Sequence, residues 1–251
     1  MNLENLVRDI AATELLYLSD PYLKEAICRI QKVEPDDRKS AYLILDKSIF
    51  HPKSGGQPSD KGKVLANTVV FDVRKVMLAS GVAVHWGRYV QGTPAIGPAQ
   101  MQIDWNLRYR CMRKHTAAHL FDHCLATVLG RRVETTDSWV GDESYIGYRG
   151  EVPAPGQLQM AEKMENQLVE KGGVVTCQLM TRQEALLSSP EAPNLARLPI
   201  DARLRVVTIE GCQGIPCGGT HVRDIREIQQ FNLKTPEGLP EGFRVHFDIT
   251  P

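Results

Sequence analysis

The sequence predicts an α+β protein in which an all-β part comes first and a part mixing helices and strands follows. Two observations predict this order. Residues 23–100 contain short apolar runs separated by turns rich in glycine and proline, as in antiparallel sheets. Residues 104–130 then carry the pattern of one long helix, and further helical and strand patterns follow it. A chain of 251 residues suits two domains, which we place at 1–98 and 99–251.

The all-β part has the spacing of a small antiparallel barrel. Four apolar runs are expected to form its strands: 26–33, 41–50, 62–76 and 81–90. The connections carry the turn residues, most clearly in HPKSGGQPSDKG at 51–62. The connection QGTPAIGPAQ at 91–100 is interpreted as a linker between the two domains.

The second part begins with a helix that we expect over 105–129. Asp104 can cap its amino end, and Gly130 stands where a helix commonly stops. The segment PGQLQMAEKMENQLVEKGG predicts a second helix that ends at its glycine pair. Strands are expected at 174–180, 204–209 and 243–249.

Composition narrows the class of protein. A hydrophobic content of 42% and a charged content of 24% are typical of globular domains. No apolar run approaches the roughly 20 residues that span a bilayer, and the amino end lacks a secretory pattern. We therefore expect a cytoplasmic protein that has no membrane partner and keeps its six scattered cysteines reduced. Because the net charge is zero, only a local basic cluster can bind nucleic acid.

Two short motifs predict a metal site. His115 and His119 are four residues apart in a helix, so both imidazoles face one side. Cys217 and His221 lie in PCGGTHV, where two glycines allow a tight turn. Two pairs of nitrogen and sulfur ligands suit zinc, and we expect about one zinc ion per chain. The other histidines, His51, His85, His123 and His246, are interpreted as core or surface residues.

The same strings carry a family resemblance. RKHTAAHL and PCGGTHV, in that order, resemble the editing domain of alanyl-tRNA synthetase. SGGQPSDKG resembles the glycine-rich loop of the barrel that precedes that domain. ELLYLSDPYLKEA and GFRVHFDI are similar to the free-standing AlaX proteins, of the medium type with an N-terminal barrel. The resemblance implies a translation-factor-like β-barrel followed by the α+β editing domain that threonyl-tRNA and alanyl-tRNA synthetases share.

The function implied by this resemblance is editing in trans. The protein would hydrolyse tRNA(Ala) carrying serine, and also glycine, without ATP, and it needs no obligate protein partner. Two other classes stay open: a zinc-containing RNA-binding protein without activity, and a metal-dependent hydrolase of another ester. Because four ligands would close a tetrahedral shell, catalysis needs five-coordination or one loosely held ligand, for which His221 is the candidate.

Several residues are candidates for substrate contacts. The Thr116 hydroxyl can bind a seryl hydroxyl or its own i−4 carbonyl. The amides of Gly218, Gly219 and Thr220 can face the ester oxygen, or the glycines can serve the turn alone. Thr135, in VETTDS, stands where the resemblance implies a glutamine. YIGYRG at 145–150 likewise departs from an acidic strand of the family, which leaves the amino acid preference open.

A local basic cluster is the candidate tRNA-binding surface, and a solvated helix face is the alternative. Its members are Arg108, Arg110, Arg113, Lys114, Arg131 and Arg132. The glycine-rich loop residues Gly55, Gly56 and Gln57 are interpreted as a contact between the barrel and the editing domain.

Overall fold

The computed structural model describes residues 2–188 and 203–250. It has two compact units, Met1–Ser54 with Pro58–Arg110, and Gly55–Gln57 with Cys111–Pro251. The domain ranges 1–98 and 99–251 stay a prediction, because compactness alone does not show that either part folds by itself. Within the described ranges, none of the helices combines the length and apolar character that crossing a membrane requires.

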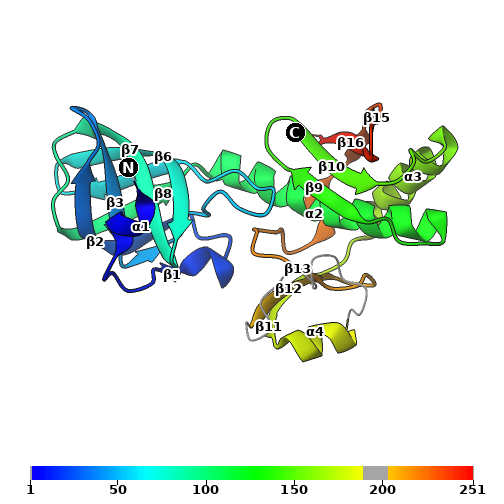
Figure 1. Cartoon of the computed structure of the whole chain (residues 1–251), viewed down its shortest axis with the longest axis horizontal. Coiled ribbons are helices and arrows are strands. Elements are labelled where there is room, and N and C mark those ends of the chain that lie inside the picture. Colours follow the sequence, from blue (N-terminus) through cyan, green and yellow to red (C-terminus); the bar gives the residue numbers. More distant parts are fainter. Residues whose placement is uncertain (1, 189–202, 251) are drawn as a thin grey trace. The chain divides into compact units, whose positions relative to one another are not determined.

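The first unit contains a closed six-stranded barrel (Figure 1). Its strands follow the order β2-β3-β7-β6-β5-β8, and every neighbouring pair is antiparallel. The bounds are β2 Glu25–Pro35, β3 Ser40–Leu45, β5 Gly62–Ala66, β6 Val69–Ala79, β7 Val82–Gln91 and β8 Gly97–Ile103. Short elements precede or join them: α1 Leu3–Val7, β1 Glu14–Leu15, the 3-10 helix Leu16–Leu18 and β4 Lys47–Ser48. Apolar side chains of all six strands fill the barrel interior.

The interpretation of 91–100 as a linker is wrong. Strand β7 runs to Gln91, and β8 begins at Gly97 and closes the barrel by pairing with β2 and β5. Ala99, Met101 and Ile103 alternate inward along β8. Three inward positions beside the glycines and prolines of this segment are too weak a pattern to outweigh its turn signals.

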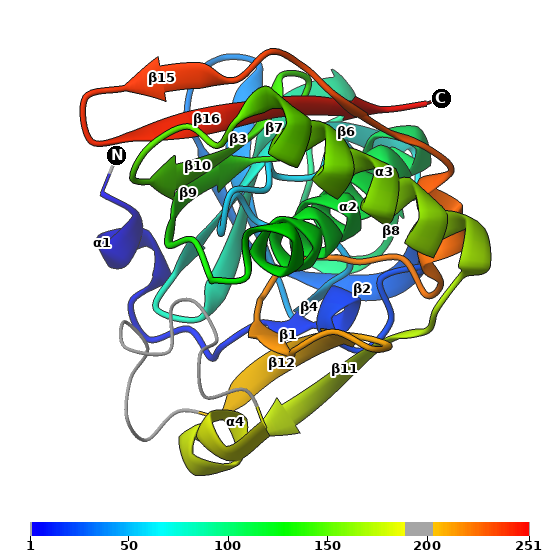
Figure 2. The same ribbon diagram turned by 90° about the vertical axis from the view of Figure 1, so that its right-hand side faces the viewer.

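The second unit is built around helix α2, Trp105–Leu129, the last nineteen residues of which belong to it. The amide of Leu107 donates to Asp104 Oδ1 at 3.1 Å, and Gly130 has a φ of +61°. Both ends of this helix therefore lie where the sequence predicts them. Helix α3, Pro155–Lys171, shares a core with α2 and with an antiparallel sheet (Figure 2). That sheet has the order β14-β16-β10-β9, with β15 also paired to β16.

Short elements complete the second unit. The sheet strands are β9 Thr135–Trp139, β10 Ser144–Arg149, β14 Phe231–Leu233, β15 Glu237–Leu239 and β16 Gly242–Ile249. A second sheet consists of β11 Val175–Met180, β12 Leu204–Ile209 and β13 Ile215–Pro216, and helix α4, Arg182–Ser188, follows β11. A 3-10 helix, Ile225–Ile228, precedes β14. The predicted fold class, a β-barrel followed by an α+β part, is confirmed.

Candidate metal centre

Two elements bring four metal-ligating side chains together. His115 and His119 lie one turn apart on α2, and Cys217 and His221 follow β13 directly. The ligand atoms of the four side chains all lie within 4.8 Å of one another. Cys217 Sγ is 3.5 Å from His115 Nε2 and 3.4 Å from His221 Nε2. The residues therefore form a cluster that could hold one metal ion.

The geometry of this cluster suits a tetrahedral ion. Zinc bonds of about 2.3 Å to sulfur and about 2.05 Å to nitrogen, at the tetrahedral angle, separate the two donor atoms by about 3.6 Å. The sulfur–nitrogen distances of 3.5 and 3.4 Å agree with that spacing. One thiol and three imidazoles are also a donor set that zinc favours.

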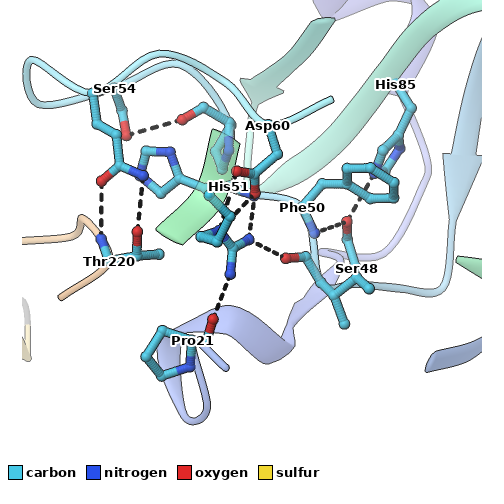
Figure 3. Close-up of polar contacts among 12 residues, drawn as sticks. Pro21, Ser48, Phe50, His51, Ser54, Asp60, His85 and Thr220 are labelled. Atoms are coloured by element: carbon cyan, nitrogen blue, oxygen red, sulfur yellow. Dashed lines mark hydrogen bonds and ion pairs between the residues drawn. The ribbon is translucent and has the colours of Figure 1, made fainter. Parts of the chain in front are cut away.

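Gln57 orients the His115 ring through Nδ1, the ring nitrogen that is not needed for a metal. Its Oε1 lies 3.0 Å from His115 Nδ1 and accepts a hydrogen bond of 3.0 Å from the Thr220 amide. Its Nε2 donates to Thr220 Oγ1 at 2.9 Å (Figure 3), which fixes the direction of the carboxamide. Since an amide oxygen only accepts, His115 carries its proton on Nδ1, and Nε2 is left for a metal.

Thr116 orients His221 in the same way. The buried hydroxyl donates to Met112 O at 2.9 Å and accepts from the Val222 amide at 3.2 Å. His221 Nδ1 lies 3.2 Å from the same oxygen and fills its remaining acceptor position. The hydroxyl is therefore fully used inside the protein, which favours the i−4 carbonyl alternative over a contact with a seryl group.

The turn between Cys217 and His221 needs its second glycine. A Cβ built on Gly219 would lie 2.2 Å from His115 Cε1, so no larger residue fits there. Arg205 supports the turn by donating to Cys217 O at 2.8 Å and to Gly219 O at 2.9 Å. The Gly219 amide faces Cys217 Sγ at 3.4 Å, and the Thr220 amide is bound to Gln57.

Of the three amides expected to face an ester oxygen, one is available. Within residues 2–188 and 203–250, the amide of Gly218 donates to no other protein group. A glycine at this position has open space beside it, because no atom lies within 4 Å of a Cβ built there. The two other candidate amides stabilise the turn.

The buried environment gives the ligands their protonation states. Burial, and to a smaller extent Arg205, lowers the pKa of His119 to about 4, so the ring is neutral at pH 7, as a ligand must be. Burial raises the pKa of the Cys217 thiol to about 11, although the Gly219 amide and Arg205 both act to lower it. Metal binding at this cysteine would therefore be accompanied by loss of the thiol proton.

A cavity of about 620 Å³ opens beside the cluster. Of the four candidate ligands, His119 alone lines it. Other lining residues come from the end of α2, the segment after it, and the β12–β13 region: Asp122, His123, Arg131, Arg132, Thr135, Thr208, Cys212 and Gln213. A cavity of this volume accommodates a small-molecule fragment. Thr135 and His123 thus lie at the same cavity as His119.

Three of the six predicted RNA-binding cations are structural. Arg108 is fully buried, forms an ion pair with Asp60, and donates to Pro21 O at 2.8 Å and to Ile49 O at 2.6 Å (Figure 3). Arg113 donates to Glu227 O at 2.7 Å and to Ile228 O at 2.9 Å.

Lys114 is also buried, and it pairs with Asp248 Oδ1 at 3.0 Å. The prediction of RNA contacts is therefore wrong for Arg108, Arg113 and Lys114, because their charges are used to join elements of the fold. Arg110 and Arg131 are exposed and Arg132 is partly exposed, so these three stay candidates.

The glycine-rich loop packs against strand β9 within the second unit. Gly56 has a φ of +77°, and a Cβ built on it would lie 2.5 Å from Ser138 Oγ. Its carbonyl accepts a hydrogen bond of 2.9 Å from the Val140 amide. Gly55 has a φ of +54° and open space beside it. The two glycines thus place Gln57 against Thr220 and His115.

Two residues at the site carry no motif of their own. Asp122 follows His119 by three residues on α2 and lines the same cavity. Helical spacing from His119 indicates that the two side chains are neighbours, but only the folded chain shows that both line a cavity. Arg205 lies on β12, far from the ligands in sequence, and only the folded chain brings it to the Cys217 turn.

Comparisons with known proteins agree with this architecture. The model of the family "tRNA synthetases class II (A)" matches residues 21–107. The model "Threonyl and Alanyl tRNA synthetase second additional domain" matches residues 204–243.

Individual relatives match a larger share of the chain than these two family models do. The alanyl-tRNA editing protein AlaX-M of Methanosarcina barkeri is 34% identical over 86% of this chain and 90% of its own length. The AlaX-M protein of Pyrococcus horikoshii is 32% identical over 87% of this chain and 89% of its own length. The alanine–tRNA ligase of Archaeoglobus fulgidus is 31% identical over 94% of this chain, which spans 26% of the ligase. The chain therefore belongs to the AlaX-M family of alanyl-tRNA editing proteins.

Proposed function

We propose that this protein is a zinc-dependent aminoacyl-tRNA deacylase that removes serine, and also glycine, from mischarged tRNA(Ala) in trans. The observation that carries the proposal is the cluster of three histidines and one cysteine, one member of which lines a cavity of about 620 Å³. Relatives that span most of the chain are named alanyl-tRNA editing proteins, which supports tRNA as the partner. We expect the reaction to take place in the cytoplasm, where tRNA is charged.

His115, His119, Cys217 and His221 would hold the zinc ion. Bound there, zinc would supply the Lewis acidity that polarises an ester carbonyl or activates a water molecule. Gln57 and Thr116 keep His115 and His221 in the tautomer that presents Nε2. His119 has no such partner within the described ranges, and it faces the cavity. His119, rather than the buried His221, is therefore the ligand held least firmly.

The residues around the cavity would bind the aminoacylated end of the tRNA. The Gly218 amide can donate to the ester oxygen, as an oxyanion site requires. Arg131 and Arg132 can contact backbone phosphates. The proposal keeps the two predicted domains, 1–98 and 99–251, as a barrel and an editing domain, with β8, Gly97–Ile103, carrying the barrel past residue 98.

A different amino acid preference is the second candidate. Thr135 lines the cavity at the position where the resemblance implies glutamine, so a smaller side chain leaves more room for the acyl group. A panel of seryl-, glycyl-, alanyl- and threonyl-tRNA separates the candidates by rate. Fast release of serine and slow release of alanine is the expected result, whereas equal rates for the two would contradict proofreading.

The metal is tested with a matched pair of cysteine variants. Purified protein should contain about one zinc ion per chain. Cys217→Ser should lose both zinc and deacylation. Cys212→Ser, which changes a cysteine that lines the cavity and is not a candidate ligand, should keep its zinc. Equal zinc loss in the two variants would refute the ligand assignment. Full zinc without hydrolysis of any aminoacyl-tRNA would instead indicate an RNA-binding protein.

A further inference from the structure

The cavity beside the metal cluster carries charges of both signs. Among its described lining residues, Asp122 is the only carboxylate, and Arg131 and Arg132 are the only arginines or lysines. Asp122 stands three residues after His119 on α2, so the two side chains are neighbours on one helix face. The arginines follow the end of that helix at Gly130. The negative charge therefore lies next to a candidate metal ligand, and the positive charges come from the segment beyond the helix.

The Asp122 carboxylate is held in place by one of its oxygens. Tyr148 Oη donates to Oδ1 at 2.5 Å, and the Tyr148 ring is buried and stacked on Phe243 at a centroid distance of 5.2 Å. Within residues 2–188 and 203–250, Oδ2 accepts no hydrogen bond. A carboxylate with one fixed oxygen and one free acceptor beside a cavity is arranged to bind a cationic donor.

The charge of this carboxylate persists at neutral pH. Burial raises the pKa of Asp122 to about 6, while the hydrogen bond from Tyr148 and the charge of Arg132 act in the opposite direction. At pH 7.5 the Asp122 carboxyl group is therefore ionised in most molecules of the protein. The cost of keeping a partly buried carboxylate ionised is offset when a cation binds to it.

We propose that Asp122 binds the α-ammonium group of the aminoacyl ester, and this inference rests on the function proposed above. The ammonium group is one carbon away from the ester carbonyl, so it must lie close to the metal cluster during hydrolysis. The phosphates of the same substrate lie beyond the ribose, toward the arginines. A substrate with a cation at its acyl end and anions at its nucleotide end thus matches the charges of the cavity.

The test compares a substrate that has the amine with one that lacks it. Seryl-tRNA(Ala) and its deaminated counterpart, in which a hydroxyl replaces the amine, have the same ester and nearly the same size. Asp122→Asn should lower kcat/KM for seryl-tRNA(Ala) by about 10- to 100-fold, the usual effect of a charged hydrogen bond. It should leave the deaminated substrate nearly unchanged. Asp122→Glu should restore part of the preference.

A control variant and two contrary outcomes separate a failure of this inference from a failure of the proposed function. His123→Gln changes the neighbouring cavity residue and should affect both substrates alike. An equal loss on both substrates in Asp122→Asn would overturn the inference, because a general base or a purely structural carboxylate acts on the two esters equally. If the wild-type protein hydrolyses neither substrate, the proposed function fails instead.

Binding supplies a second measurement that needs no hydrolysis. The probe is 3′-seryl-amino-3′-deoxyadenosine, with an amide in place of the ester, together with its deaminated form. Calorimetry with the zinc-loaded wild type should show about 10-fold or more tighter binding of the amine-bearing probe. Equal affinities in the wild type would overturn the inference even if every Asp122 variant failed to fold.

Discussion

The hydroxyl of Thr116 lies 3.2 Å from Nδ1 of the candidate ligand His221, so we expect it to support metal binding and not substrate selection. Thr116→Val keeps the shape of the side chain but removes the acceptor for His221 and for the Val222 amide. We expect zinc affinity to fall by about 10- to 100-fold, as when other second-sphere partners are removed. Titration against a competing chelator measures this change. The ratio of seryl-tRNA to alanyl-tRNA hydrolysis at saturating zinc should not change.

Thr127→Val is the matched control for that substitution. Thr127 lies on the same helix and donates to the carbonyl four residues earlier at 2.8 Å, but it is exposed and contacts no ligand. Its variant should keep the wild-type zinc affinity. If Thr116→Val changes the ratio of seryl-tRNA to alanyl-tRNA hydrolysis but leaves zinc binding unaltered, Thr116 would instead be a substrate-binding residue.

We expect Glu165 to make the stability of the second unit depend on pH. It is fully buried on α3, and among the described residues its two oxygens have no hydrogen-bond partner. Burial, with Asp122 and Glu162 nearby, raises its pKa well above 4.5. The folded state therefore keeps a proton that the unfolded state loses, so the contribution of Glu165 to stability is greatest below pH 4.5 and falls as pH rises toward the folded-state pKa.

Glu165→Gln removes this titration. Relative to the wild type, the variant should gain stability between pH 5.5 and pH 8, by up to about 1.4 kcal/mol per pH unit. Urea unfolding at the two pH values measures the difference. Glu170→Gln changes an exposed residue of the same helix and should show no such trend. A constant difference between wild type and Glu165→Gln would contradict the assignment.

The sequence predicts which side chains come together in the candidate metal cluster better than it predicts the roles of the cations. Histidines four apart on a helix face one point whatever surrounds them, so a local spacing identifies a ligand pair. The role of Arg108 or Lys114 depends on distant partners, Asp60 and Asp248, that no local pattern reveals. Asp122 escapes notice for the same reason, since its use depends on the cavity that the fold creates.

At the scale of elements, Gly55 and Gly56 of the glycine-rich loop differ in how much space is available for a larger side chain. Gly55→Ala meets only the strain of a left-handed backbone, about 1–2 kcal/mol. Gly56→Ala adds a Cβ that would collide with Ser138, so the loop carrying Gln57 must shift. We expect Gly56→Ala to lose more stability than Gly55→Ala and also to bind zinc more weakly. Denaturant unfolding and zinc titration measure both effects, and similar values for the two variants would contradict this account.

Elements with strong local signals are the ones the sequence predicts. Helix α2 has a cap, a stop and 25 residues of helical pattern, and it begins and ends as expected. Strand β8 is not recognised because prolines and glycines directly precede its three inward positions. Strands β14 and β15 have three residues each, which is too short for an alternation to be recognised. Pairing with β16 stabilises them, and pairing is a property of the folded sheet.

At the scale of the whole molecule, the net charge is zero, so the attraction of tRNA has to come from a local cluster of basic residues. Charge reversal at Arg131 and Arg132 should weaken tRNA binding and reduce the salt slope by about 0.7 to 0.9 for each phosphate that the protein no longer neutralises. Lys163→Glu with Lys171→Glu changes the net charge equally on exposed α3 positions outside the cavity and should have a smaller effect. Binding isotherms at several salt concentrations decide this, and equal slopes for both variants would remove the arginines from the tRNA-binding surface.

The position of Gln57 limits how this protein can be shortened. A chain that began at residue 99 would keep all four candidate ligands, yet it would leave His115 Nδ1 and the Thr220 amide without their buried acceptor. We therefore expect that a fragment able to bind the metal would have to be discontinuous in sequence and include the loop around Gln57. If residues 99–251 are fused to another protein, they should bind metal well only when that protein supplies a carboxamide in the position of the Gln57 side chain.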